Sequence, residues 1–266
     1  MTDHRRVQRA LFRMQMDAAF AARIAAGEGE AEASTGLADD DLALLRALDP
    51  EAVAADARDQ RKGQLLGNLA SEFGLTALAA PDGLLPSFLS SPEFHDAIAS
   101  DALLPLAFGA FAKRTAAEEE LAGVAAMARL ELGMARLRRS RGDAPPLAED
   151  ELSLSPRAAL VELQEGTLAW ASELSEARAL GQAPRGASLG AATETVLLVA
   201  DQAPPHRLPD VRPELLEPAA RELLTRCTSS LDRSAQAELA TDLGASLEEL
   251  DGFVASLVAE GVLRRG

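Results

Sequence analysis

The C-terminal segment of the chain predicts one helix with clearly marked ends. Ser246 and Glu249 have the spacing of a capping box, in which a hydroxyl and a carboxylate each bind a backbone N–H at a helix start. Gly261 ends the helix before a short apolar pair. Between these ends, six apolar residues recur at three- and four-residue steps: Leu247, Leu250, Phe253, Val254, Leu257 and Val258. Such a helix buries one face, so the C-terminal region is expected to fold around it.

The segments before this helix predict a small α+β unit. "AALVELQ" (158–164) and "TETVLLVA" (193–200) are short apolar runs typical of strands, and a helix containing Trp170 separates them. Prolines interrupt the following stretch, so a strand in "HRLPDV" (206–211) must be short or lie at a sheet edge. Two more helices are expected at 214–227 and 234–242. Strands followed by three helices are the pattern of helix-turn-helix and winged-helix units.

The rest of the chain is expected to be helical. Alanine and leucine dominate it, aromatic residues make up only 3% of the sequence, and tyrosine is absent. The Pro- and acid-rich stretch "RGDAPPLAEDELSLSP" (141–156) is the strongest candidate linker. The sequence therefore predicts a mainly α fold: an N-terminal helical domain (1–140), a linker (141–156) and a small α+β, winged-helix-like domain (157–266).

Within the first domain, three features give specific expectations. Ser91 followed by Pro92 favours a helix start. Thr115 and Glu118 have capping-box spacing, which predicts a helix over about 116–140. The apolar, Gly- and Pro-punctuated stretch 73–94 is too hydrophobic for a solvated linker, and we expect it to contact a partner protein because exposed apolar patches mark interfaces.

The charge of the chain argues against nucleic acid and membrane as partners. The formal net charge is -16, and residues 153–266 hold seventeen Asp and Glu against ten Arg and no Lys. Phosphate groups and anionic lipids repel such a surface. The predicted last helix itself offers acids at its polar positions, among them Glu248 and Glu260. With no long apolar segment and no signal peptide, a cytoplasmic location is the expectation.

The sequence offers little that supports catalysis. His4, His95 and His206 lie far apart, and none has a metal-ligand partner at helical spacing, so no metal site is predicted. His95 is expected to be an ordinary helix-surface or contact residue. The single cysteine, Cys227, shares a face with leucines and is predicted to be buried packing. No phosphate-binding glycine loop is present. We therefore predict a protein with no cofactor and no enzymatic activity of its own.

The C-terminal segments resemble a known family of peptide-binding modules. "TETVLLVADQAPPHRLPDV", "ELLEPAARELLTRC" and "LEELDGFVASLVAEGVLRR" are similar to the PqqD-like recognition element, which binds leader sequences of ribosomally made, post-translationally modified peptides. The match to its ending falls on Phe253, Leu257, Gly261 and Leu263. Two departures stand out, because "CTSS" lacks the usual glycine and the prolines of "APPHRLP" interrupt the hairpin.

The N-terminal segments resemble a related group of proteins. "GLADDDLALLRALDPEAVAADARDQRKGQLLGNLASEFGLTAL", "FLSSPEFHDAI" and "LPLAFGAFA" look like the helical region of partner proteins that accompany multinuclear non-haem iron oxidative enzymes, such as the partner subunit of methanobactin biosynthesis. This resemblance implies a separate iron-dependent TIM-barrel enzyme that modifies a precursor peptide, and a non-catalytic chain that presents the peptide to it. "GLADDDLALLRAL" is also similar to small helical accessory subunits of ring-cleaving dioxygenases.

A peptide-binding site follows from the expected strand and the last helix. An extended peptide would pair with the backbone of the second strand and place side chains against the helix, near two cations. The predicted peptide-binding residues are Val196, Leu197, Leu198, Val199, Arg207, Arg212, Leu250, Phe253, Val254 and Leu257. The apolar members fit a plain core equally well. Two other interpretations stay open: a winged-helix transcriptional regulator, and a C-terminal unit that only packs on the first half of the chain.

Overall fold

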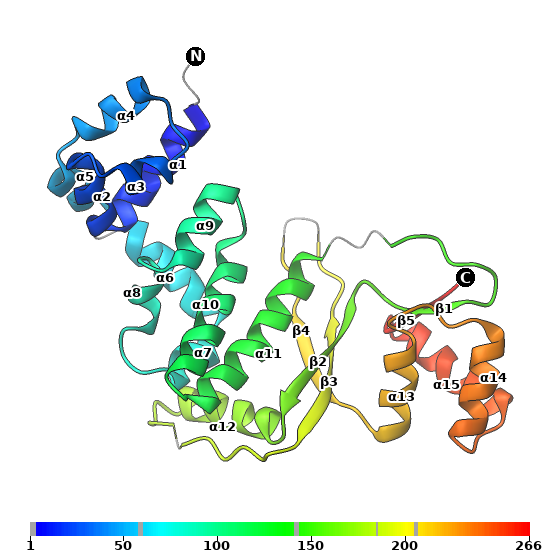
Figure 1. The fold of residues 1–266 in the computed structure, drawn as a ribbon. Helices are drawn as coiled ribbons and strands as arrows, with labels where there is room; N and C mark the ends of the chain where they lie inside the picture. Colours follow the sequence, from blue (N-terminus) through cyan, green and yellow to red (C-terminus); the bar gives the residue numbers. More distant parts are fainter. Residues whose placement is uncertain (1–3, 58–60, 141–143, 185, 205–206) are drawn as a thin grey trace. The chain divides into compact units, whose positions relative to one another are not determined.

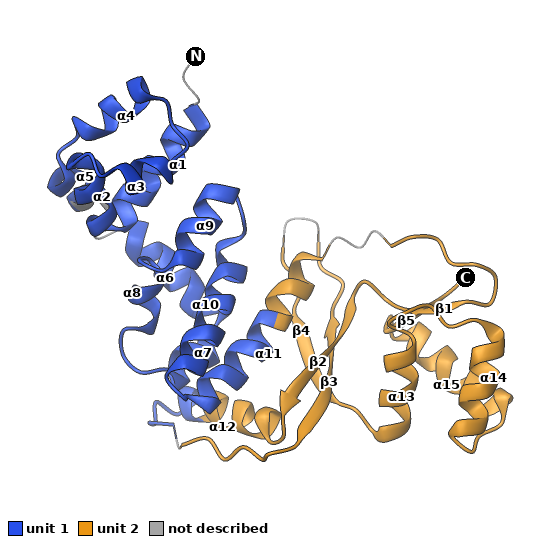
Figure 2. Ribbon diagram, viewed as in Figure 1, with its two compact units in different colours: residues 1–132, 177–184 blue, residues 133–176, 185–266 orange. Residues whose placement is uncertain are grey.

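The computed structural model describes residues 4–57, 61–140, 144–184, 186–204 and 207–266. The described chain is mainly helical with a small antiparallel sheet near its C-terminus, which confirms the predicted fold class. It divides into two compact units (Figure 2), one formed by residues 1–132 and 177–184 and the other by residues 133–176 and 185–266. We refer to them as the N-terminal and the C-terminal unit.

The N-terminal unit is built from helices alone (Figure 1). Its helices are α1 (His4–Met16), α2 (Ala18–Ala25), α3 (Gly29–Ala33), α4 (Asp39–Arg46), α5 (Pro50–Ala57), α6 (Arg61–Glu72), α7 (Gly74–Ala79), α8 (Leu84–Phe88), α9 (Pro92–Ser100), α10 (Leu104–Glu118) and the first part of α11 (Ala122–Arg139). The predicted start at Ser91 is correct, because its hydroxyl accepts the Phe94 amide at 3.2 Å. Residues 58–60, between α5 and α6, lie outside the described part.

A cluster of phenylalanines forms much of the core of this unit. Phe88 packs edge to face against Phe94 and Phe108, with ring centroids 5.4 and 5.3 Å apart. Phe73, Phe88 and Phe94 are fully buried. The stretch 73–94 therefore supplies the unit's own core, and the expectation that it exposes an apolar patch to a partner was wrong.

The predicted helix start at Thr115 was also wrong. Thr115 and Glu118 lie in the last turn of α10, and a break separates them from α11. The Glu118 carboxylate accepts a hydrogen bond from Arg114 at 2.7 Å instead of capping a helix. Glu120 takes a left-handed conformation with φ of 56°, which reverses the chain direction before α11. Capping-box spacing alone does not distinguish a helix start from the end of a preceding helix.

The C-terminal unit combines two small antiparallel sheets with helices. It contains the end of α11, β1 (Leu152–Leu154), β2 (Ala158–Gln164), most of α12 (Thr167–Ala179), β3 (Thr193–Ala200), β4 (Val211–Leu215), α13 (Pro218–Arg226), α14 (Arg233–Asp242), α15 (Leu247–Ala259) and β5 (Leu263–Arg265). One sheet has the order β2-β3-β4, and the other pairs β1 with β5. The two strands and three closing helices expected from the sequence are present, and β4 adds an edge strand.

The three-stranded sheet is covered on both faces. One face places Leu197 and Val199 in a core with residues of α13, α14 and α15. On the other face, α11 lies against the sheet at Gly133 (Figure 1). A Cβ at that position would be 2.9 Å from Leu198 Cδ1 and 3.0 Å from Val161 Cγ2, so only glycine fits without movement.

The division between the units differs from the linker expected at 141–156. It falls inside α11, between Leu132 and Gly133, because the end of this helix packs on the sheet. Residues 141–143 lie outside the described part. The rest of the expected linker belongs to the C-terminal unit, where Leu152 pairs with Arg265 and also bridges to Leu231.

Candidate functional site

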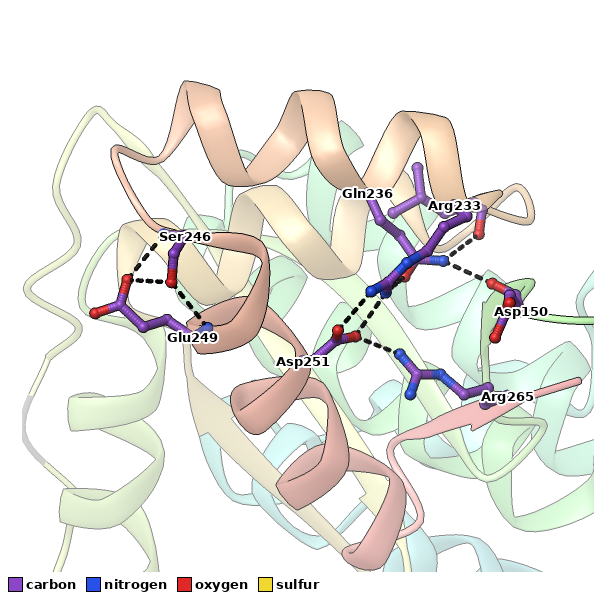
Figure 3. Close-up of polar contacts among 8 residues, drawn as sticks. Asp150, Arg233, Gln236, Ser246, Glu249, Asp251 and Arg265 are labelled. Atoms are coloured by element: carbon purple, nitrogen blue, oxygen red, sulfur yellow. Dashed lines mark hydrogen bonds and ion pairs between the residues drawn. The ribbon is translucent and has the colours of Figure 1, made fainter.

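The three closing helices are held in place by caps and ion pairs (Figure 3). Ser246 and Glu249 form the predicted capping box: the Ser246 amide donates to Glu249 Oε2 at 2.8 Å, and the Glu249 amide donates to Ser246 Oγ at 3.2 Å. These bonds from the amide and then the hydroxyl of Ser246 lower the pKa of Glu249. The start of α15 is thereby fixed to one residue.

Asp251 joins two other elements to α15. Arg233 of α14 donates to both of its carboxylate oxygens, at 2.7 and 2.6 Å, and Arg265 of β5 donates at 2.7 Å (Figure 3). The hydrogen bonds from Arg233 first, and then from Arg265, hold the pKa of Asp251 well below its ordinary value. Gln236 donates to the Asp150 carbonyl at 2.7 Å. These contacts link α14, α15 and β5 to one another and α14 to the segment before β1.

Three of the predicted groove residues on α15 are core residues. Leu250, Val254 and Leu257 are 4%, 0% and 8% exposed and pack with residues of α13 and α14. They repeat at helical spacing on the face that covers the sheet, so no groove remains for a peptide to fill there. Phe253 lies off this face and is 41% exposed. The prediction of a peptide groove walled by Leu250, Val254 and Leu257 is therefore corrected.

The predicted backbone pairing at Val196, Leu197, Leu198 and Val199 is also corrected. These residues lie in β3, the central strand, and each has a partner on both sides. Val199, for example, is opposite Ala158 of β2 and Arg212 of β4. Their side chains are buried on both faces. A continuous apolar run is typical of a strand covered on both faces, and β3 has no free edge because it pairs with β2 on one side and β4 on the other.

The accessible edge is instead that of β4. This strand pairs with β3 alone among the described strands, and four of its five residues are exposed. The Asp201 amide donates to the Asp210 carbonyl, so residues 210, 212 and 214 face β3. The backbone of Val211, Pro213 and Leu215 therefore points away from the sheet. Pro213 lacks an N–H, so this edge has carbonyls at three positions and amides only at Val211 and Leu215.

A cleft adjoins the start of this edge. It has a volume of about 600 Å³ and lies at the ends of β3 and α11, beside the segment that leads into β4. Its lining includes three arginines, Arg138, Arg157 and Arg207, and one acid, Asp201. Arg157 donates from Nε and Nη2 to the Ala200 carbonyl, at 3.1 and 2.7 Å, which fixes its side chain. The cleft is thus polar and locally cationic in a strongly acidic chain.

Both arginines predicted from the sequence lie next to this edge. Arg207 lines the cleft and is 4.0 Å from Asp210, and Arg212 of β4 is 3.3 Å from Asp201. All four side chains are about half or more exposed. Exposed pairs of this kind contribute roughly 0–1 kcal/mol, so these arginines can exchange partners at small cost. No pattern in the sequence indicated Arg138 and Arg157, which are brought to the cleft by the fold.

The cysteine and the described histidines show no arrangement that is typical of a catalytic or metal site. Cys227 is fully buried, and burial raises the pKa of its thiol to about 11, so it is not a thiolate at neutral pH. Among the described residues, no group of three or more His, Cys, Asp or Glu side chains is arranged to hold a metal ion. His206 lies outside the described residues. His95 is not a plain surface residue, since it contacts Arg13 and Asp17.

Comparison with known proteins does not show a family for this chain. No protein-family model matches it, and no curated protein sequence is significantly similar to it. In the described part of the chain, no helix has both the length and the apolarity that crossing a membrane requires. The geometry of the β4 edge and the adjoining cleft is therefore the basis for a functional hypothesis.

Proposed function

We propose that this chain binds an extended, acidic segment of another polypeptide and presents it to a separate enzyme. The observation that carries the proposal is the exposed edge of β4 beside an arginine-lined cleft. An added strand would pair with the outward backbone of Val211 and Leu215, and acidic side chains would contact Arg207 and Arg212. The site expected from the sequence lay beside β3, whereas the proposed site lies beside the neighbouring strand β4.

Two properties of the edge support a peptide as the ligand. Leu215, the last residue of β4, is 62% exposed, and Leu208, which precedes β4, is 49% exposed. Apolar side chains of an added strand could pack against these two leucines. Pro213 removes the central donor of the edge, so an added strand can accept hydrogen bonds only from the outward amides on either side of it, which fixes the register of that strand.

The resemblance of the sequence to partner proteins of iron-dependent oxidative enzymes supplies the biological setting of the proposal. In this setting the ligand is a ribosomally made precursor peptide, and the catalyst is a separate TIM-barrel enzyme that holds the iron. The present chain has no catalytic residues and no cofactor of its own, and it acts in the cytoplasm. The buried, protonated thiol of Cys227 agrees with this role.

No observation favours the alternative of a transcriptional regulator. A DNA-reading helix needs cations for phosphates and Arg, Asn or Gln for base edges. Helix α15 contains none of these residues, and its exposed positions include Glu248, Glu249 and Glu260.

Titration of the full chain with labelled peptides tests the proposal. The peptides tile the small open reading frames encoded next to this gene, and fluorescence anisotropy reports binding. We expect one acidic peptide to bind saturably and a variant with its acids replaced by amides to bind at least about tenfold more weakly. If no peptide binds, or if the amide variant binds equally well, the proposal is wrong.

A further inference from the structure

A second cavity lies in the N-terminal unit and is independent of the peptide site. It has a volume of about 310 Å³, at the lower end of the range for small-molecule sites. One wall is the face of α1 that carries Arg6, Arg9 and Arg13, and the others are the turn 34–36 and α9. The described residues that line it include three arginines and no acid. The cavity is therefore cationic, although the chain as a whole has a net charge of -16.

The innermost of these arginines is buried, and none of the described carboxylates forms an ion pair with it. Arg13 is 8% exposed, and its guanidinium lies 3.7 Å from the centre of the Phe20 ring. Its two terminal nitrogens donate to Ser34 Oγ and to His95 Nδ1, both at 2.9 Å, and its buried Nε has no hydrogen-bond acceptor. Burial, which outweighs the attraction of Asp17, lowers the pKa of Arg13 to about 10.

The nearest acid, Asp17, is committed to other partners. Its Oδ1 accepts the amides of Ala19 and Phe20 at the start of α2, and its Oδ2 lies 2.9 Å from His95 Nε2. Burial acts to raise the pKa of Asp17, but the bonds from His95 and the Phe20 amide outweigh it and lower the pKa. The His95 ring thus lies between Asp17 and Arg13, with Nε2 2.9 Å from Asp17 Oδ2 and Nδ1 2.9 Å from Arg13.

The second arginine also has unused donor capacity. Arg9 donates to the Ala99 carbonyl at 3.2 Å and contacts Asp101 Oδ2 at 2.7 Å, but its buried Nε has no acceptor. Asp101 is shared with Arg5, so one carboxylate serves two arginines. The buried guanidinium of Arg13 and that of Arg9, whose side chain is 25% exposed, thus each retain a buried Nε–H with no acceptor among the described residues. Unsatisfied charged donors in a built cavity are costly unless a ligand completes them.

We propose that this cavity binds a small metabolite through an oxyanion, either a phosphate or a carboxylate group. The planar guanidinium groups of Arg9 and Arg13 suit the paired oxygens of such a group, and Arg6 at the rim adds charge. Ile98 and Ala33 give the remaining wall an apolar character that suits a short carbon chain. The preformed support of Arg13 by Ser34 and His95 means that little ordering is required on binding.

Calorimetric titration and thermal unfolding of the full chain test this inference. The probes are inorganic phosphate and succinate, each against sodium chloride at equal ionic strength. We expect saturable binding of at least one probe and a rise in the unfolding midpoint with its concentration. The probe that binds more tightly, phosphate or succinate, shows whether the cavity recognises a phosphate or a carboxylate group. Absence of saturable binding in both arms would overturn the inference.

Variants locate the binding. We expect Arg9→Gln to weaken binding about tenfold or more, because it removes a charge-assisted donor. Ala33→Glu, at an exposed position on the cavity wall, is expected to abolish binding by placing a carboxylate there. Arg114→Gln, which removes an exposed arginine paired with Glu93 and Glu118 elsewhere in this unit, serves as the control and should bind normally. If Arg9→Gln and Ala33→Glu both bound the probe with the affinity of the wild type, the site would also be contradicted.

Discussion

At the scale of single residues, the ionised groups of the C-terminal unit have structural roles that depend on pH. Asp251 illustrates this, because two arginines from different elements converge on its carboxylate. Its pKa is depressed in the folded chain relative to an ordinary aspartate. The stability that it contributes is therefore present above the ordinary pKa of Asp, about 3.9, and is lost as the pH falls through the lower folded value.

We predict that Asp251→Asn is less stable than the wild type at neutral pH, by about 1 kcal/mol or less, since the pairs are partly exposed. The difference should shrink as the pH falls below about 4, where this carboxylate begins to protonate in the unfolded chain while it stays ionised in the folded one. Urea unfolding at several pH values measures it. Asp210→Asn, which removes an exposed acid 4.0 Å from Arg207, is the control and should change little. A difference that grows toward low pH would contradict this account.

At the scale of helices and strands, the sequence predicted where the elements lie in the chain better than it predicted which elements they pack or pair with. The runs 158–164 and 193–200 were correctly predicted as strands, and the capping box at Ser246 was correct, because these signals are local. The prediction that β3 offers a free edge failed for a reason that lies outside the segment. The apolar run of β3 is equally compatible with an open or a central strand, and only the position of β4 decides between them.

The candidate site shows the same limit. Arg207 and Arg212 were identified because they lie close in sequence to the expected strands, whereas Arg138 comes from the end of a distant helix. The buried position of Leu250, Val254 and Leu257 follows from their spacing, but the same spacing would suit a groove. The cavity around Arg13 was not predicted, since His95 and Ser34 are brought to α1 only by tertiary packing.

Close packing of α10 predicts a contrast between two glycines. A Cβ at Gly109 would lie 2.7 Å from Leu132 Cδ1 and 2.9 Å from a Phe73 ring carbon, so Gly109→Ala should destabilise the protein by about 1–3 kcal/mol. Gly67 is exposed inside α6 with no atom within 4 Å of such a Cβ, so Gly67→Ala should stabilise by about 0.5–1 kcal/mol. Chemical denaturation compares them. Equal effects of both substitutions would contradict the packing.

The β4 edge predicts a contrast between two substitutions at one exposed position. Leu215→Ala and Leu215→Pro both remove the leucine side chain, but only proline removes the outward amide. We expect both variants to fold, because this amide makes no bond to β3, and only Leu215→Pro to lose a further tenfold or so in peptide affinity. Peptide titration measures the difference. Identical affinities in the two variants would exclude backbone pairing at this position.

At the scale of the whole molecule, the distribution of charge matters more than its total. The chain is strongly acidic, yet arginines gather at the C-terminal cleft and at the N-terminal cavity. Local cationic sites in an anionic protein favour compact acidic ligands over long polyanions, because the surrounding acids repel the rest of a polyanion.

We therefore predict that the full chain does not bind duplex DNA at physiological salt, while its affinity for an acidic peptide falls as salt is added. Gel-shift assays with random-sequence and upstream duplexes, alongside peptide titrations at several salt concentrations, measure both. DNA binding tighter than peptide binding would favour the regulator instead.

The central claim is that a peptide adds as a strand to β4, and amide hydrogen exchange tests it directly. The amides of Arg212 and Glu214 face β3, whereas those of Val211 and Leu215 face outward. Of the two outward-facing residues, Leu215 is 62% exposed and Val211 is 6% exposed, so the test rests on Leu215. We predict that saturating peptide slows exchange at Leu215 and leaves Arg212 and Glu214, already protected, nearly unchanged. Unchanged exchange at Leu215 in the presence of a bound peptide would contradict the claim.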